Sequence, residues 1–177
     1  MKPVLNLFAS LAAIGLVVSI VSHVYALFGL PGPLGDSSWV LHIGIFVVWI
    51  PAVIASQSLS RNVPSKDFWK AALRGCPPWM KYLTYFFFGY AIFNFAIFFI
   101  TAPSHPPSGP MPPAVVRGFS GHWMAFYCAA LSILYSKTRT QGQHRPTHCP
   151  NGHSISPLAK FCQACGSPVG PGSIGPK

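Results

Sequence analysis

Four side chains of the kinds that bind metal ions lie close together near the end of this 177-residue chain. Three residues separate Cys149 from His153, two separate Cys162 from Cys165, and eight separate the two pairs. Thiolate sulfur and imidazole nitrogen are ligands that zinc prefers, and a structural zinc ion takes four ligands in a tetrahedron. Because the protein would fill every position and leave none for a substrate, the spacing predicts a structural zinc ion rather than a catalytic one.

The residues around the two pairs favour the same site. Gly166 directly follows the Cys-x-x-Cys pair and permits the tight turn that brings two sulfurs to one metal. Phe161 stands just before that pair and can cover one side of the site. A segment of about 20 residues cannot bury a core of its own, so the metal would supply the folding energy. One alternative stays open, because His148 is a competing candidate for the position of His153.

This tail resembles the short zinc-ribbon modules that end many prokaryotic proteins, in their Cys-x3-His…Cys-x2-Cys variant. The resemblance extends over residues 147–169 and departs from the commoner pattern at position 153, where a histidine replaces the second cysteine. It implies a module that binds protein or nucleic acid, or that serves only as a structural cap. The residues that it marks as zinc ligands are Cys149, His153, Cys162 and Cys165.

The rest of the chain has the composition of a membrane protein. Hydrophobic residues make up 51% of the sequence and charged residues 8%, whereas ordinary soluble domains carry about 25% charged residues. The apolar blocks lack the alternation of barrel strands, and each approaches the roughly 20 residues that cross a bilayer as a helix. The blocks are residues 4–28, 39–55, 82–102 and 115–135. We therefore expect an all-α membrane protein, a four-transmembrane-helix bundle over residues 1–137 with a small C-terminal cytosolic zinc ribbon.

The basic residues predict the orientation of these spans. Eleven of the twelve fall before the first span, between the second and third, or after the fourth, and Arg117 is the exception. Lysine and arginine accumulate on the cytosolic side of membrane proteins. Both termini are thus expected in the cytosol, with the protein in the cell membrane as a multi-pass protein. The formal charge of +10 then reflects topology, with some attraction to the anionic lipid bilayer, and nucleic acid is not favoured as a partner.

Residues 65–75 are predicted to form a short helix at the cytosolic interface. Ser65 can cap its start, and Gly75 followed by two prolines can end it. Lys66, Lys70 and Arg74 are spaced by four and share one face, opposite an aromatic face, which is typical of helices lying in the interface. An ordinary solvated loop is the alternative.

Three other segments are predicted to lack regular structure. Residues 102–113 are rich in proline, residues 138–146 form a polar linker, and residues 170–177 form a disordered tail. The first span could also be a secretory signal that is cleaved after Ala26, but its apolar run is longer than the usual 7–15 residues. We therefore expect an anchor rather than a cleaved signal.

Polar residues inside the predicted spans define a second candidate site. His23, His42, Asn94 and His122 fall toward the outer leaflet, one in each span. Ionisable groups inside a membrane are costly and often functional. Converging imidazoles could ligate haem iron or another metal, hydrogen-bond a quinone or relay protons. The alternative is that these groups only join helices to one another.

No catalytic motif stands out in the sequence. Asp36 and Asp67 are the only acidic residues, which nearly excludes acid–base catalysis by carboxylates. The favoured function is a multi-pass membrane protein that presents its zinc ribbon to an unknown cytosolic protein partner. A membrane redox, haem- or metal-handling protein that uses the outer histidines is the first alternative, and a small transporter or channel is the second. The oligomeric state stays open.

Overall fold

The computed structural model describes residues 2–61, 63–101, 112–141, 148–149, 151–155 and 159–169. These residues form helices and, in the C-terminal part, two isolated β-bridges, so the predicted all-helical class is confirmed. Most of the proline-rich segment, most of the linker and the predicted tail 170–177 lie outside the described residues. The four long helices are α1 (Lys2–Leu27), α2 (Trp39–Leu59), α4 (Pro78–Thr101) and α5 (Pro113–Thr140).

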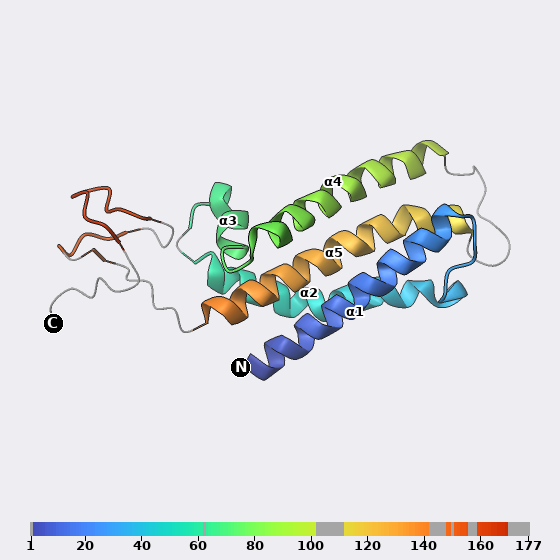
Figure 1. Ribbon diagram of the computed structural model, residues 1–177, viewed down its shortest axis with the longest axis horizontal. Coiled ribbons are helices and arrows are strands. Elements are labelled where there is room, and N and C mark those ends of the chain that lie inside the picture. The colour runs from blue at the N-terminus through green and yellow to red at the C-terminus, as the bar shows by residue number, and fades with distance from the viewer. Residues whose placement is uncertain are drawn as a thin grey trace.

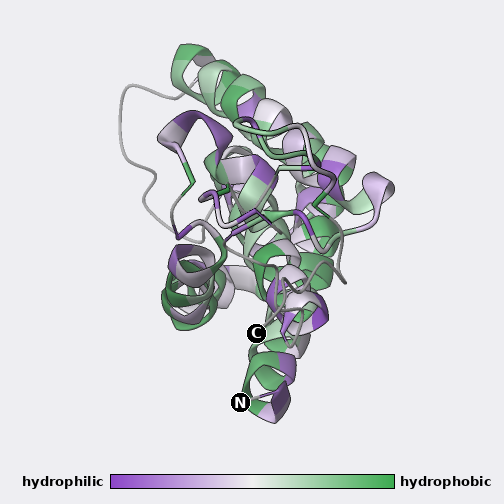
Figure 2. Ribbon diagram, turned by 90° about the vertical axis from the view of Figure 1, so that its left-hand side faces the viewer, coloured by the Kyte–Doolittle hydropathy of each residue, from purple (hydrophilic) through white to green (hydrophobic). Residues whose placement is uncertain are grey.

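The long helices run back and forth along a common direction (Figure 1). As a result, the start of α1, the end of α2, the start of α4 and the end of α5 lie at one end of the molecule. The sequence positions of nine described basic residues therefore put them at or beyond this end, whereas Arg117 lies near the start of α5 at the other end. In the view onto this end, α2 and α4 are predominantly hydrophobic and the turn around α3 is hydrophilic (Figure 2).

Several helices extend beyond the apolar blocks because polar residues at their ends are satisfied locally. Helix α2 continues to Leu59, where the hydroxyls of Ser56 and Ser58 donate to the carbonyl oxygens of Val53 and Ala55 at 2.8 and 2.7 Å. Helix α5 continues to Thr140, so the first residues of the predicted linker are helical. Such side-chain bonds let short polar residues continue a helix into water.

Helix α5 is the central helix of the bundle. It packs against α1, α2 and α4, and 15 of its 28 residues are buried, compared with four of the 24 residues in α4. Many of its buried residues are small, which lets helix backbones approach closely in a membrane. They include Gly118, Ser120, Gly121, Ala125, Ala129, Ala130, Ser132 and Ser136.

Three helical segments are long and apolar enough to cross a membrane: α1, α2 with the preceding 3-10 turn Gly35–Ser38, and α4. Helix α5 is longer than any of them, but it is not apolar enough by the same measure. The central position explains this difference, because a helix covered by protein on most sides does not need an apolar surface to face lipid. A fourth membrane span therefore stays a prediction.

Tyr127 joins three helices at the middle of the bundle. Its ring, on α5, lies where a Cβ atom on Gly15 of α1 would stand. Its hydroxyl donates to the carbonyl oxygen of Leu41 on α2 at 2.8 Å and lies where a Cβ atom on Gly44 would stand. Two glycines on two different helices thus make room for one tyrosine.

The predicted helix 65–75 is shorter in the structure. A 3-10 turn, Ser65–Asp67, leads into α3 (Phe68–Ala72), which ends three residues before the predicted end. Ala71, Ala72 and Leu73 are buried against the bundle, and the Trp69 ring packs 5.4 Å from Phe88 of α4. The apolar side of α3 is therefore docked, at least in part, on protein.

Candidate metal centre

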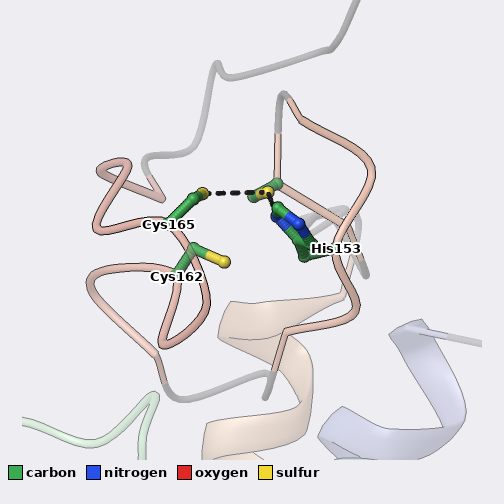
Figure 3. A group of neighbouring side chains, drawn as sticks. His153, Cys162 and Cys165 are labelled. Carbon is green, nitrogen blue, oxygen red and sulfur yellow. Dashed lines mark hydrogen bonds between the residues drawn. The ribbon is translucent and has the colours of Figure 1, made fainter.

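The C-terminal residues bring four ligand atoms to one place. The sulfurs of Cys149, Cys162 and Cys165 and a ring nitrogen of His153 all lie within 4.8 Å of one another. The labelled side chains His153, Cys162 and Cys165 point toward a common centre (Figure 3). These are the four residues that the sequence predicts as ligands, and the group could hold a metal ion.

Two similar turns position the ligands. In the first, the Gly152 amide donates to the Cys149 carbonyl at 2.9 Å, and in the second the Gly166 amide donates to the Cys162 carbonyl at 2.8 Å. Both glycines have positive φ, 80° and 71°, a backbone conformation that side chains with a Cβ rarely adopt. Each turn is closed by one antiparallel bridge, His148 with Ser154 and Phe161 with Pro168.

Two of the distances between ligand atoms match those around a tetrahedral zinc ion. Two sulfurs about 2.3 Å from zinc would lie about 3.8 Å apart in a tetrahedron, and a sulfur and a nitrogen about 3.6 Å apart. The sulfurs of Cys149 and Cys165 are 3.7 Å apart, and the Cys149 sulfur lies 3.5 Å from Nδ1 of His153. Three soft thiolates and one imidazole also match the ligand preference of zinc.

The local hydrogen bonds favour the ligating form of one cysteine. Hydrogen bonds with the side chain and backbone of Ser167 lower the pKa of the Cys165 thiol to about 5. A metal binds the thiolate and not the thiol, so Cys165 is prepared for ligation at neutral pH. Next to it, hydrogen bonding to Cys149 and then to Cys165 raises the pKa of His153, so a proton competes with the metal at this nitrogen.

The described residues of the tail have little core apart from the ligands. Among them, Cys149, Ile155 and Cys162 are the buried hydrophobic residues, with Val169 packed against them. The chain matches no protein-family model, no curated protein and no solved structure. The ligand geometry of this chain is therefore what indicates the metal centre.

The structure distributes the four polar residues of the predicted membrane site over separate places. His23, on α1, is hydrogen-bonded through Nδ1 to the Ser120 hydroxyl of α5 at 2.7 Å and through Nε2 to the Tyr90 hydroxyl of α4 at 2.5 Å. Asn94, on α4, donates its amide hydrogens to the carbonyl oxygens of Arg117 and Gly118 at 2.5 and 3.3 Å. Both side chains join neighbouring helices to α5.

His42 and His122 are the two members of that set that lie together. Their rings are nearly parallel, at 10°, with centroids 5.9 Å apart. His122 stands two residues after Ser120, the partner of His23, which is a rotation of about 200° around a helix. His23 and the His42–His122 pair therefore contact opposite faces of α5. Among the described residues, the tail supplies the one group of three or more metal-binding side chains.

Sequence reasoning missed the partners of these histidines. The sequence did not predict that the histidines would form hydrogen bonds with Ser120, Tyr90 and Trp123, although each of these is a polar or amphipathic residue in an apolar span. Neither Tyr90 nor Trp123 stands out by type, because aromatic residues make up 14% of the chain. Only the helix packing distinguishes these residues from the other aromatics.

Proposed function

We propose that this chain is a four-span membrane protein that holds one zinc ion in a cytosolic C-terminal ribbon and recruits a protein partner through that ribbon. The observation that carries the proposal is the group of three cysteines and one histidine whose ligand atoms lie within 4.8 Å of one another. It occurs in a chain with three helices suited to a membrane, which makes the ribbon a module tied to the membrane surface.

The length and surroundings of α5 support a fourth span. At 1.5 Å per residue, 28 residues extend about 42 Å, more than the roughly 30 Å of the hydrocarbon core. Its buried serines find partners in the bundle, as where Thr84 of α4 lies 2.8 Å from the Ser132 hydroxyl. Polar groups paired inside the protein do not oppose membrane insertion as groups facing lipid would.

The orientation can be tested with a membrane-impermeant maleimide. Ser37 and Lys66 are exposed at opposite ends of the bundle. We expect Ser37→Cys to be labelled in intact cells and Lys66→Cys to be labelled only after the membrane is made permeable. The unsubstituted chain is the control, because Cys76 and Cys128 are buried and the tail cysteines would be cytosolic. Labelling in the reverse order would contradict the proposed topology.

An exposed aromatic residue supports a role in partner binding. Phe161 directly precedes the buried ligand Cys162, and 61% of its surface is exposed. Its bridge to Pro168 holds it in the second turn, so the metal would fix its position. Aromatic residues held rigidly at a surface are common centres of protein interfaces. The proposed partner is therefore a protein with an apolar pocket for this ring.

We expect Phe161→Ala to reduce partner recruitment at least tenfold without changing the zinc content, because aromatic residues at interface centres contribute about 2 kcal/mol or more. The partner would be identified by cross-linking and mass spectrometry, and its affinity measured with purified proteins. Gln163→Ala, at a neighbouring exposed position, is the matched control. Undiminished binding by both Phe161→Ala and a chain depleted of zinc would contradict the proposal.

A further inference from the structure

The pair formed by His42 and His122 is independent of the zinc ribbon and has a different chemistry. His42 belongs to the first turns of α2 and His122 to α5, and both imidazoles are partly exposed. Four aromatic rings lie close to the pair, so it is set in a largely apolar wall. The ring centroids of Trp39, Phe46 and Phe119 are 5.7, 6.2 and 6.3 Å from His42, and that of Phe126 is 4.6 Å from His122.

A hydrogen bond from Trp123 determines which nitrogen of His42 carries its proton. The indole Nε1 of Trp123 lies 3.2 Å from Nδ1 of His42. An indole N–H can only donate, so Nδ1 must be the acceptor. A neutral imidazole has one donor and one acceptor nitrogen, and the proton of His42 is therefore on Nε2. Trp123 is fully buried, which holds this arrangement in place.

This tautomer is unsuited to a metal ligand. A metal at Nε2 would need the lone pair of that nitrogen, and the ring proton would then have to move to Nδ1. Two N–H groups, those of Trp123 and His42, would face each other without an acceptor. His42 therefore presents an N–H donor, and its recognition chemistry is that of a hydrogen bond to an acceptor.

The described part of the chain provides no acceptor for this donor. Among those residues, the hydrogen bond from Trp123 is the one that involves His42, and His122 has ring contacts but no hydrogen bond. A polar group facing an apolar medium without a partner is costly, so a molecule that supplies an acceptor oxygen would be stabilised here. An apolar body would also match the surrounding aromatic rings.

We propose that His42 and His122 form a binding site for a carbonyl oxygen carried by an apolar molecule of the membrane. Two sources have this chemistry, the ring carbonyl of a quinone and the ester carbonyl of a lipid. The site lies close to the beginning of α2, where Trp39 is exposed, and tryptophan is enriched at the level of the lipid headgroups. Both kinds of carbonyl reach that level, and neither requires a metal.

The quinone source is tested with the full-length protein in detergent and a short-chain quinone, decylubiquinone, by titration calorimetry. His42→Leu is expected to weaken binding about tenfold, the contribution of one hydrogen bond. Trp123→Phe should weaken it as well, because the proton of His42 can then move to Nδ1. Phe93→Leu, on the lipid-facing side of α4, is the control and should bind as the original chain does. Circular dichroism and thermal unfolding establish that each variant is folded.

The lipid source is tested in nanodiscs made of diester or diether phosphatidylcholine. The imidazole nitrogens are observed by ¹⁵N NMR of histidine-labelled protein, with His42→Leu to assign the signals. A shift of the His42 Nε2 signal between the two lipids, without quinone binding, identifies the ester carbonyl as the acceptor. The proposal is overturned if Nε2 carries no proton, or if folded variants show neither His42-dependent quinone binding nor a lipid-dependent shift.

Discussion

Replacing Cys162 by alanine is expected to remove zinc from the chain and to unfold the described part of the tail, residues 148–149, 151–155 and 159–169, while the helices stay folded. Cys162 is 2% exposed and belongs to a core whose other apolar members are Cys149, Ile155 and Val169. So small a core cannot offset the entropy of ordering the tail. In zinc-finger peptides, the metal contributes about 10–16 kcal/mol, and its loss abolishes folding. Elemental analysis should show one zinc ion per unsubstituted chain and none in the variant.

Limited proteolysis reports the unfolding directly. Lys160 stands between the two turns, and trypsin should cut after it rapidly in Cys162→Ala or after treatment with a chelator. Cys128→Ala is the matched control, because this buried cysteine lies in α5, away from the metal centre. The Cys128→Ala chain should therefore keep its zinc ion. His148→Ala should also keep the metal, whereas His153→Ala should lose it. Full zinc content in His153→Ala with loss in His148→Ala would assign the fourth ligand to His148 and contradict the geometry.

The second large effect is expected from Gly15→Leu, which should destabilise the membrane domain by about 3 kcal/mol. A Cβ atom at this position overlaps with the ring of Tyr127, and the ring cannot retreat freely because its hydroxyl is bound to the Leu41 carbonyl. Separation of α1 from α5 would also expose Ser19 and Ser22, which are fully buried. Reversible unfolding in mixed detergent micelles would measure the change in the free energy of unfolding.

Gly89→Leu provides the control for that measurement. Gly89 lies in α4 with no atom near the position of a new Cβ, so the same substitution adds helix propensity without a clash. It is expected to leave stability unchanged or slightly increased. Equal losses for the two variants would show that α1 does not pack on Tyr127. A double variant, Gly15→Ala with Tyr127→Ala, should lose less stability than the sum of the losses in the two single variants, because the added methyl group no longer meets the ring.

The sequence alone determined the features that depend on residues close together along the chain. The apolar runs predict the membrane helices, because a backbone in lipid must satisfy its hydrogen bonds within the same segment. The spacing of Cys149, His153, Cys162 and Cys165 predicts the metal group, because two short turns are enough to bring these side chains together. The glycines that those turns require, Gly152 and Gly166, are also visible in the sequence.

Only the tertiary structure decided the features that depend on which helices face each other. Helix α5 is the central helix, and its polar and small residues, which weaken its apolar pattern, are those that pack against its neighbours. Four polar residues at similar depth were expected to form one site. Ser120 and His122 are about 200° apart around α5, so His23, which bonds to Ser120, and His42, which stacks on His122, lie on opposite faces of this helix. Depth in the membrane follows from position along the chain, whereas direction around a helix follows from packing. For that reason, the pairing of His42 with His122 and Trp123 could be recognised only in the folded bundle.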